Sequence, residues 1–202
     1  MKGPFCLLVI LLLSSCAMGQ RPAVLDSFTN PDGAFQFVYP DHYELLTGER
    51  ILRATQGRGA GIPVCDFSTA LVCVIYPVEQ QASLNFEGAG FSVHEAPGIT
   101  TESDCLAYAG RLSRPGGEQP PPTSITINGS AFRYVFVKRA TAGHSQSSEL
   151  YISFQKEHCY ELRIAISLSD ESRRSSSKAV ELAEAESARR ALKLVLSTFV
   201  FR

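Results

Sequence analysis

Cysteine and histidine are the residues of this 202-residue chain best suited to covalent or metal chemistry, and it holds six and four of them. Cys6 and Cys16 lie in the N-terminal 20 residues, and the other cysteines are Cys65, Cys73, Cys105 and Cys159. None of the four forms a CxxC pair, and an even set in an exported chain indicates two disulfides. Four cysteines allow three pairings. The short spacing favours Cys65 with Cys73, which leaves Cys105 with Cys159.

Catalytic motifs are absent from the sequence: it has no GxSxG, HExxH, P-loop or GxGxxG pattern. A nucleophilic site could combine Cys159 or a serine with His144 and Asp66, but only if distant segments meet. His158 and Cys159 are neighbours on an expected strand, so their side chains point to opposite faces and cannot pair. We therefore assign no catalytic or cofactor-binding residue, and expect no cofactor.

A metal site made of His144, Glu157 and His158 is conceivable. Scattered histidines on strands and loops are more often solvated or capped than metal-bound, so we assign no metal ligand.

The N-terminus has the features of an export signal. Lys2 precedes an apolar run from Phe5 to Leu13, and small residues follow. This run of about nine residues is far shorter than the roughly 20 that span a bilayer, so residues 1–19 are predicted to be a signal peptide.

Two processing sites overlap at the end of this segment. Leu13-Ser14-Ser15-Cys16 matches a bacterial lipobox, after which Cys16 would carry acyl chains that hold the protein on a membrane. Ala17-Met18-Gly19 instead suits an ordinary signal peptidase, whose product would be soluble and begin at Gln20. We favour the lipoprotein, which would be lipidated at Cys16 and located in a bacterial cell envelope, facing the periplasm or the surface.

Composition places the rest of the chain in one globular domain. Hydrophobic residues make up 45% and charged residues 19%, and the formal net charge is -1. Such a balance argues against nucleic-acid binding, which needs a clear cationic excess. We expect a tether over residues 20–32, closed by the turn signal Asn30-Pro31-Asp32-Gly33, and a single domain over residues 33–202.

The first half of the domain reads as short strands. Phe35, Phe37 and Tyr39 alternate and should face the core, and Pro40 ends the run. Further extended segments are expected at 43–46, 50–55, 71–76 and 91–94, with a flexible loop at 56–61. A helix should begin near Thr101, which precedes Asp104 at capping-box spacing, and end before a proline-rich loop over 114–122.

The second half reads as an antiparallel meander followed by the longest helix. Asn128-Gly129 is the strongest hairpin signal. Asn128 also begins an N-glycosylation pattern, which we attribute to the turn. More strands are expected around 132–136, 151–154 and 159–166. The apolar stripe of the helix over 177–196 should face the core, and a short strand over 198–201 should close the chain. The stripe consists of Leu182, Ala185, Ala188, Leu192 and Val195.

Two terminal motifs support a resemblance. The run from Phe35 to Pro40, followed by Tyr43-Glu44-Leu45-Leu46, resembles the opening of PsbP-like domains, and the long helix that runs into Ser197–Phe201 is similar to their end. The resemblance implies an α+β fold, an α-β-α sandwich with a central antiparallel sheet flanked by helices. Members mostly act as binding or assembly proteins in photosynthetic membranes, nuclear transport and bacterial envelopes. This chain departs from them in lacking tryptophan and in its four cysteines.

The sequence therefore predicts a non-catalytic binding or assembly protein of the envelope, whose partners are the membrane, through the lipid, and an envelope protein or a small ligand. The loops at Gly57–Gly61 and Arg114–Thr123 are the segments where contacts are expected, because exposed loops commonly carry binding. The alternative is a small secreted hydrolase or metal-dependent enzyme whose site the sequence does not reveal.

Overall fold

The computed structural model describes residues 24–51, 64–65, 69–77, 86–112, 121–141, 143–169 and 178–202, with side chains of the last segment from residue 183. The expected signal peptide with Cys16 and the Gly57–Gly61 loop lie outside the described residues, as does most of the Arg114–Thr123 loop.

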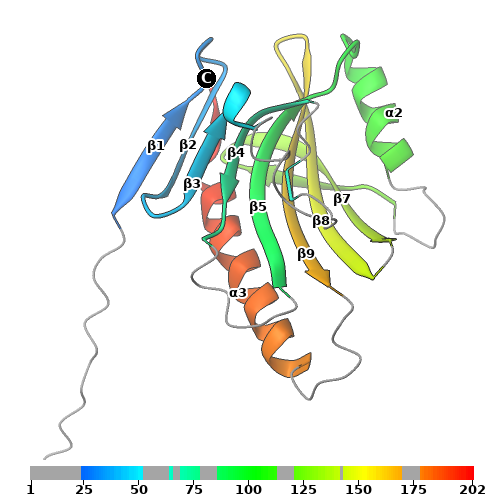
Figure 1. Ribbon diagram of the computed structural model, residues 1–202. Coiled ribbons are helices and arrows are strands. Elements are labelled where there is room, and N and C mark those ends of the chain that lie inside the picture. The colour runs from blue at the N-terminus through cyan, green and yellow to red at the C-terminus, as the bar shows by residue number, and fades with distance from the viewer. Residues whose placement is uncertain are drawn as a thin grey trace, which may run out of the picture.

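A seven-stranded antiparallel sheet forms the centre of the molecule, with strand order β3-β4-β5-β9-β8-β7-β6 (Figure 1). Its strands are β3 (Glu44–Thr47), β4 (Ala70–Ile75), β5 (Phe86–Glu95), β6 (Thr123–Ile127), β7 (Ser130–Thr141), β8 (His144–Gln155) and β9 (His158–Ser169). A second sheet has the order β1-β2-β10 and consists of β1 (Leu25–Thr29), β2 (Phe35–Pro40) and β10 (Val200–Phe201).

Helices cover the two faces of the large sheet. α3 (Lys178–Ser197) and the small sheet pack on one face, which we call the α3 face, and bury the main apolar core there. α2 (Glu102–Leu112) packs against β7 and β8 on the opposite face, the α2 face. The expected fold is confirmed: the protein is α+β, with a central antiparallel sheet flanked by helices and a long C-terminal helix.

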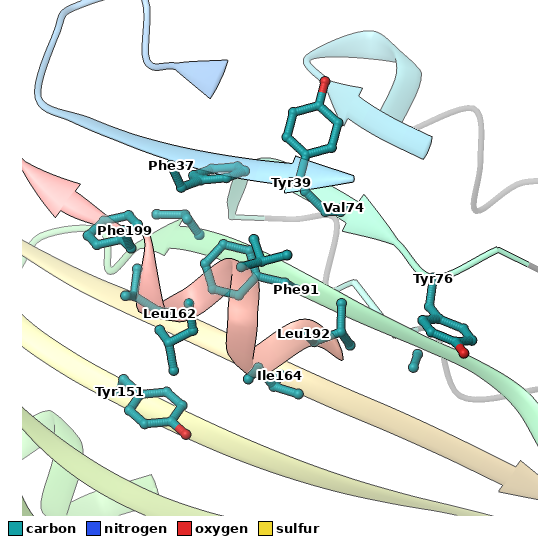
Figure 2. Packing of buried hydrophobic residues seen from close by; sticks show 14 of the residues in the cluster. Phe37, Tyr39, Val74, Tyr76, Phe91, Tyr151, Leu162, Ile164, Leu192 and Phe199 are labelled. Atoms are coloured by element: carbon teal, nitrogen blue, oxygen red, sulfur yellow. The ribbon is translucent and has the colours of Figure 1, made fainter. Parts of the chain in front are cut away.

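The main core interlocks the two sheets and α3. The alternation in β2 buries Phe35, Phe37 and Tyr39, as predicted. Figure 2 shows Phe37 from the small sheet beside Phe91 of the large sheet, and their ring centroids lie 5.4 Å apart. Leu192 enters the same cluster from α3 and is fully buried.

Two expectations were wrong. Residues 25–29, expected within the tether, form β1, which pairs with β2 along its whole length. Most of this strand is exposed, so its sequence lacks the apolar alternation that indicates a strand. Arg50 and Ile51 are helical rather than extended, because Ile51 N–H donates to the carbonyl of Gly48 and closes a turn.

The hairpin turns explain the register of the second half. Asn128 and Gly129 both have positive φ, 46° and 84°, and join β6 to β7 as predicted. Lys156 and Glu157 join β8 to β9 with φ of 48° and 68°, although neither is a usual residue for this backbone region. Within the described part of the chain, no helix is long and apolar enough to cross a membrane.

Candidate functional site

The cysteines that could have supplied a nucleophile are joined in pairs. The structure links Cys65 to Cys73 and Cys105 to Cys159, with Cα atoms 6.3 Å and 5.6 Å apart, as the spacing predicted. All four residues are at most 2% exposed. Buried cysteines that are paired in this way cross-link the fold and offer no free thiol.

The two histidines considered for a nucleophilic or metal site lie at opposite ends of the β8–β9 hairpin. His144 faces Ser169 and His158 faces Gln155 in the strand register, a separation of roughly 35 Å along the strands. Each has its own carboxylate: His144 Nδ1 lies 2.5 Å from Glu87 and His158 Nδ1 lies 2.7 Å from Glu95. The residues considered for a metal site therefore do not meet, and the described residues contain no metal-binding cluster of three such groups. Asp66 lies outside those residues.

A groove runs between α3 and the adjoining ends of β7, β8 and β9, with a volume of about 500 Å³. Its apolar lining includes Phe136, Ile166 and Leu168 from the sheet and Ala185 from the helix. Pockets for small molecules and short segments fall in the range of roughly 300–1,000 Å³ and are lined mainly by apolar groups. The size and lining of the groove are thus suited to binding.

The strand register builds this groove. Lys138, Ser147 and Ile166 are paired across β7, β8 and β9 in one row, which forms part of the floor. Ala140, Ser145 and Leu168 form the next row by the same pairings. Because side chains alternate along a strand, Phe136, Lys138 and Ala140 all lie on the α3 face. Ala185 of α3 has a small side chain, which leaves space above these rows.

A buried carboxylate anchors α3 beside the groove. Glu149 is 4% exposed, and it receives Arg189 Nε at 3.1 Å, Lys193 Nζ at 3.1 Å and the Tyr151 hydroxyl at 2.6 Å. Burial, and next the hydrogen bond to Glu149, raises the pKa of Tyr151 above its usual 10.0. Arg189 also pairs with Glu186 on its own helix. These groups bond to one another, so this cluster attaches α3 to the sheet and is not a ligand site.

The β7 edge of the groove is different, because its two cations have no acidic partner among the described residues. Lys138 and Arg139 are exposed, and neither forms an ion pair among the described residues. The Lys138 ammonium lies 5.7 Å from the centre of the Phe136 ring. The groove therefore combines an apolar floor with exposed cations along its β7 edge, while the carboxylate that lines it, Glu186, is paired with Arg189 of the same helix.

A second polar cluster is enclosed on the α2 face of the sheet. Ser92 Oγ lies 2.7 Å from His94 Nε2, and Thr69 Oγ1 lies 3.1 Å from His94 Nδ1. A serine and a histidine in this contact are typical of a nucleophile and its base, but here a threonine occupies the place of the orienting carboxylate. Ser92 and His94 are 0% and 3% exposed. A substrate cannot reach this pair in the structure.

Beside this pair lies a buried carboxylate on β9. Glu161 accepts hydrogen bonds from Arg163 at 2.9 and 2.6 Å and from the Tyr108 hydroxyl of α2 at 2.7 Å. Both Glu161 and Arg163 are buried. This group links α2 to the sheet.

The sequence did not reveal the groove or either polar cluster. One signal was present: Lys138-Arg139 interrupts an apolar alternating strand, and Ser92, His94, Glu161 and Arg163 interrupt two others. Polar and charged residues at such positions indicate either a hydrogen-bonding partner within the fold or a binding surface. The strand pairing is needed to separate these two cases.

No family model matches the chain, and no curated protein matches it. Solved structures that do match include PsbP (CyanoP) from Synechocystis sp. PCC 6803, with 13% identity, a TM-score of 0.44, and coverage of 94% of this chain and 99% of that one. LpqN, involved in cell envelope biogenesis of Mycobacterium tuberculosis, has 12% identity and a TM-score of 0.46, with coverage of 90% of this chain and 86% of that one. The Ran-binding protein Mog1p of Saccharomyces cerevisiae has 12% identity and a TM-score of 0.45, with coverage of 89% of this chain and 96% of that one.

The chain also spans about half, 48%, of a Bacteroides thetaiotaomicron protein, at 11% identity and a TM-score of 0.46. A PsbP protein is thus among the similar structures, in agreement with the resemblance of the two terminal motifs. Because the TM-scores quoted are below 0.5, we infer nothing about the function of this chain from these likenesses.

Proposed function

We propose that the protein is an exported bacterial lipoprotein that binds a partner in the cell envelope without catalysis. In this proposal cleavage before Cys16 removes residues 1–15 of the signal peptide, and Cys16 carries the lipid. The segment from there to β1 is the tether, and the remaining chain is one binding domain. The groove between α3 and β7 is its binding site.

The observation that supports this function is the contrast between the groove and the polar clusters. The acids and bases of the two enclosed clusters, around Glu149 and Glu161, are buried and bonded to each other, as in Glu161 with Arg163. The exposed cations Lys138 and Arg139, in contrast, adjoin an apolar floor and form no ion pair among the described residues, and the carboxylate that lines the groove, Glu186, is paired with Arg189. An open apolar surface with unneutralised charge favours docking, whereas converging titratable groups in a deep pocket would favour an enzyme.

Anchoring is tested by the intact mass of the protein purified from its native membrane, before and after reduction. We expect a chain that begins at Cys16 with acyl groups, lighter by about 4 Da before reduction because two disulfides are closed. A Cys16→Ser variant should be released from the membrane. A bare chain that begins at Gln20 would contradict the lipid anchor.

Binding is tested by retention of envelope proteins on the immobilised chain. Retention through the groove should be lost in Lys138→Glu and preserved in Arg190→Glu, which makes the same charge change on an exposed position of α3. A hydrolytic activity of the purified protein that Ser92→Ala abolishes would contradict the non-catalytic proposal.

A further inference from the structure

Among the described residues, strand β7 has an unpaired edge along the groove, which we call its free edge. Its pairing with β6 runs only from Ser130 to Tyr134, whereas its pairing with β8 continues to Thr141. No other strand in the described part of the chain pairs with β7 beyond Tyr134. An unpaired strand edge presents a row of N–H and C=O groups that can pair with another chain.

The hairpin turns show which backbone groups point outward. A two-residue turn is closed by a hydrogen-bonded pair, here Ile127 with Ser130 and Thr141 with His144. Counting in steps of two from these pairs, the odd-numbered residues of β7 bond to β8 and the even-numbered residues face away from it. Phe136, Lys138 and Ala140 therefore offer their N–H and C=O groups to a partner. No backbone hydrogen bond satisfies them within the described residues.

The same three residues place their side chains toward the groove. A strand added at this edge would alternate its own side chains in the same way, so every second one would lie over the apolar floor. Main-chain hydrogen bonds then supply affinity, and the groove selects side chains.

Charge narrows the choice of occupant. Lys138 and Arg139 both lie at the β7 edge of the groove, and because side chains alternate along the strand, that of Lys138 lies on the α3 face and that of Arg139 on the α2 face. Neither forms an ion pair among the described residues. Directly opposed like charges destabilise a strand pair, whereas opposite charges stabilise it. A second copy of this chain would bring its own Lys138 and Arg139 to the edge, so charge repulsion disfavours it. A partner strand with adjacent acidic residues matches both cations.

We propose that the free edge of β7 over residues 136–140 binds an extended acidic segment of a partner protein as an added antiparallel strand. The inference rests on the proposed function, because it names the kind of partner that the groove takes. Opposite Ala140 and Phe136 the segment carries apolar residues that enter the groove. Opposite Arg139 and Lys138 it carries two glutamates or aspartates.

The probe is a blocked peptide, Thr-Leu-Glu-Glu-Val-Leu-Thr, in which the two leucines oppose Ala140 and Phe136. The affinity of this peptide for the mature protein, purified after processing in the cell, is measured by calorimetry. We expect binding, and we expect the peptide with both glutamates replaced by lysine not to bind. Binding of the lysine peptide with equal affinity would overturn the proposal.

Backbone N-methylation separates strand addition from simple charge attraction. The glutamate opposite Lys138 turns its N–H toward β7, whereas the valine opposite Val137 turns its N–H away. N-methylation of that glutamate should weaken binding about tenfold or more, the scale of one lost backbone hydrogen bond whose acceptor is left buried without a partner. N-methylation of the valine should leave affinity within about twofold. Equal effects of the two modifications would overturn strand addition.

Proline variants test the edge from the protein side. Ala140→Pro removes an N–H that has no partner, so the fold should remain while peptide binding is lost. Val137→Pro removes an N–H that bonds to β8, so it should lower the unfolding temperature instead. Lys138→Glu should weaken binding about tenfold without any backbone change, and Arg190→Glu should leave it unchanged. Wild-type affinity in both Ala140→Pro and Lys138→Glu would overturn the proposal.

Three further outcomes are distinguishable. If the free protein is a dimer by sedimentation and Ala140→Pro makes it a monomer, a second copy occupies the edge and the proposal is wrong. If the peptide does not bind but envelope proteins are still retained in a Lys138-dependent way, strand addition fails while the proposed function stands. If retention is absent as well, the proposed function fails.

Discussion

The two helices are fastened to the sheet in different ways. From residue 183 onward, α3 buries five apolar side chains against the sheets, namely Ala185, Ala188, Leu192, Val195 and Leu196. α2 buries only Cys105 and Ala109, and its Leu106 is 43% exposed. Burial of apolar surface is the main source of stability, so α2 gains much less stabilisation from its apolar contacts than α3 does.

Both helices also reach a buried carboxylate on the sheet. Arg189 and Lys193 of α3 bind Glu149, and Tyr108 of α2 binds Glu161. In addition, only α2 has a covalent link, from Cys105 to Cys159. A helix with little buried apolar surface can thus be held in place by a cross-link, so the two helices should respond differently to reduction.

The largest expected effect is therefore the loss of the Cys105–Cys159 disulfide. The double variant Cys105→Ala/Cys159→Ala opens a loop of 54 residues and should lower the free energy of unfolding by about 4 kcal/mol in the chain-entropy model. Backbone amides of α2 should exchange faster, while those of α3 should not.

The matched control is the other disulfide. Cys65→Ala/Cys73→Ala opens a loop of 8 residues, for which the same model gives about 2.5 kcal/mol. It should leave exchange in α2 unchanged. Equal exchange of α2 with and without its disulfide would show that the apolar and hydrogen-bonded contacts hold this helix alone.

The next effect tests the apolar attachment of α3. Leu192 is fully buried and Leu194 is 70% exposed on the same helix. Leu192→Ala should lower the free energy of unfolding by about 2–5 kcal/mol, because it removes buried surface and leaves a cavity. Leu194→Ala should change it by less than about 0.5 kcal/mol. Urea unfolding measures both, and similar values would contradict the packing described for α3.

The Glu149 cluster gives α3 a dependence on alkaline pH. Burial and the bond to Glu149 raise the pKa of Tyr151 above 10.0, so the folded state keeps this phenol neutral while the unfolded state ionises it. The contribution of Tyr151 to the free energy of unfolding is fully present below pH 10. It falls as pH rises toward the pKa of the folded state, by up to about 1.4 kcal/mol per pH unit.

Tyr151→Phe removes the ionisable group. At pH 8 the variant should have a lower free energy of unfolding than the wild type, because the substitution removes the hydrogen bond to Glu149. At pH 11 this difference should be smaller, because only the wild type loses stability through ionisation of Tyr151. Urea unfolding at the two pH values measures it. A difference that is the same at both would mean that Tyr151 ionises alike in the folded and unfolded states.

Local patterns in the sequence were enough to predict much of the fold. The alternation of Phe35, Phe37 and Tyr39, the apolar stripe of α3 and the Asn128-Gly129 turn each depend on a few neighbouring residues. The disulfide pairing followed from a short spacing and an even count. These features are set by periodicity and backbone geometry, which a sequence records directly.

The candidate site could not be predicted, because it depends on pairing between distant residues. Ile166 reaches the groove beside Lys138 only through the register of two successive hairpins, one of which turns on Lys156 and Glu157. The free edge of β7 follows from where β6 stops. β1 was missed for a related reason, since an exposed strand is defined by its neighbour rather than by its own pattern.

The smallest effect is expected where the hairpin of β6 and β7 meets the end of α3. The Asn128 side-chain amide donates hydrogen bonds to the carbonyls of Ser197 at 2.7 Å and Phe199 at 2.8 Å. Asn128→Gly keeps the positive φ of the turn but removes both bonds, so it should lower the free energy of unfolding by about 1 kcal/mol.

Asn128→Asp sharpens this test because it also suits the turn yet has no amide to donate. Its carboxylate would face two carbonyl oxygens, so it should be at least as destabilising as glycine in thermal unfolding. If aspartate instead matches the wild type, the turn alone accounts for asparagine at this position. The end of α3 would then be held by its apolar contacts and by Glu149, which would widen the difference between α3 and the cross-linked α2.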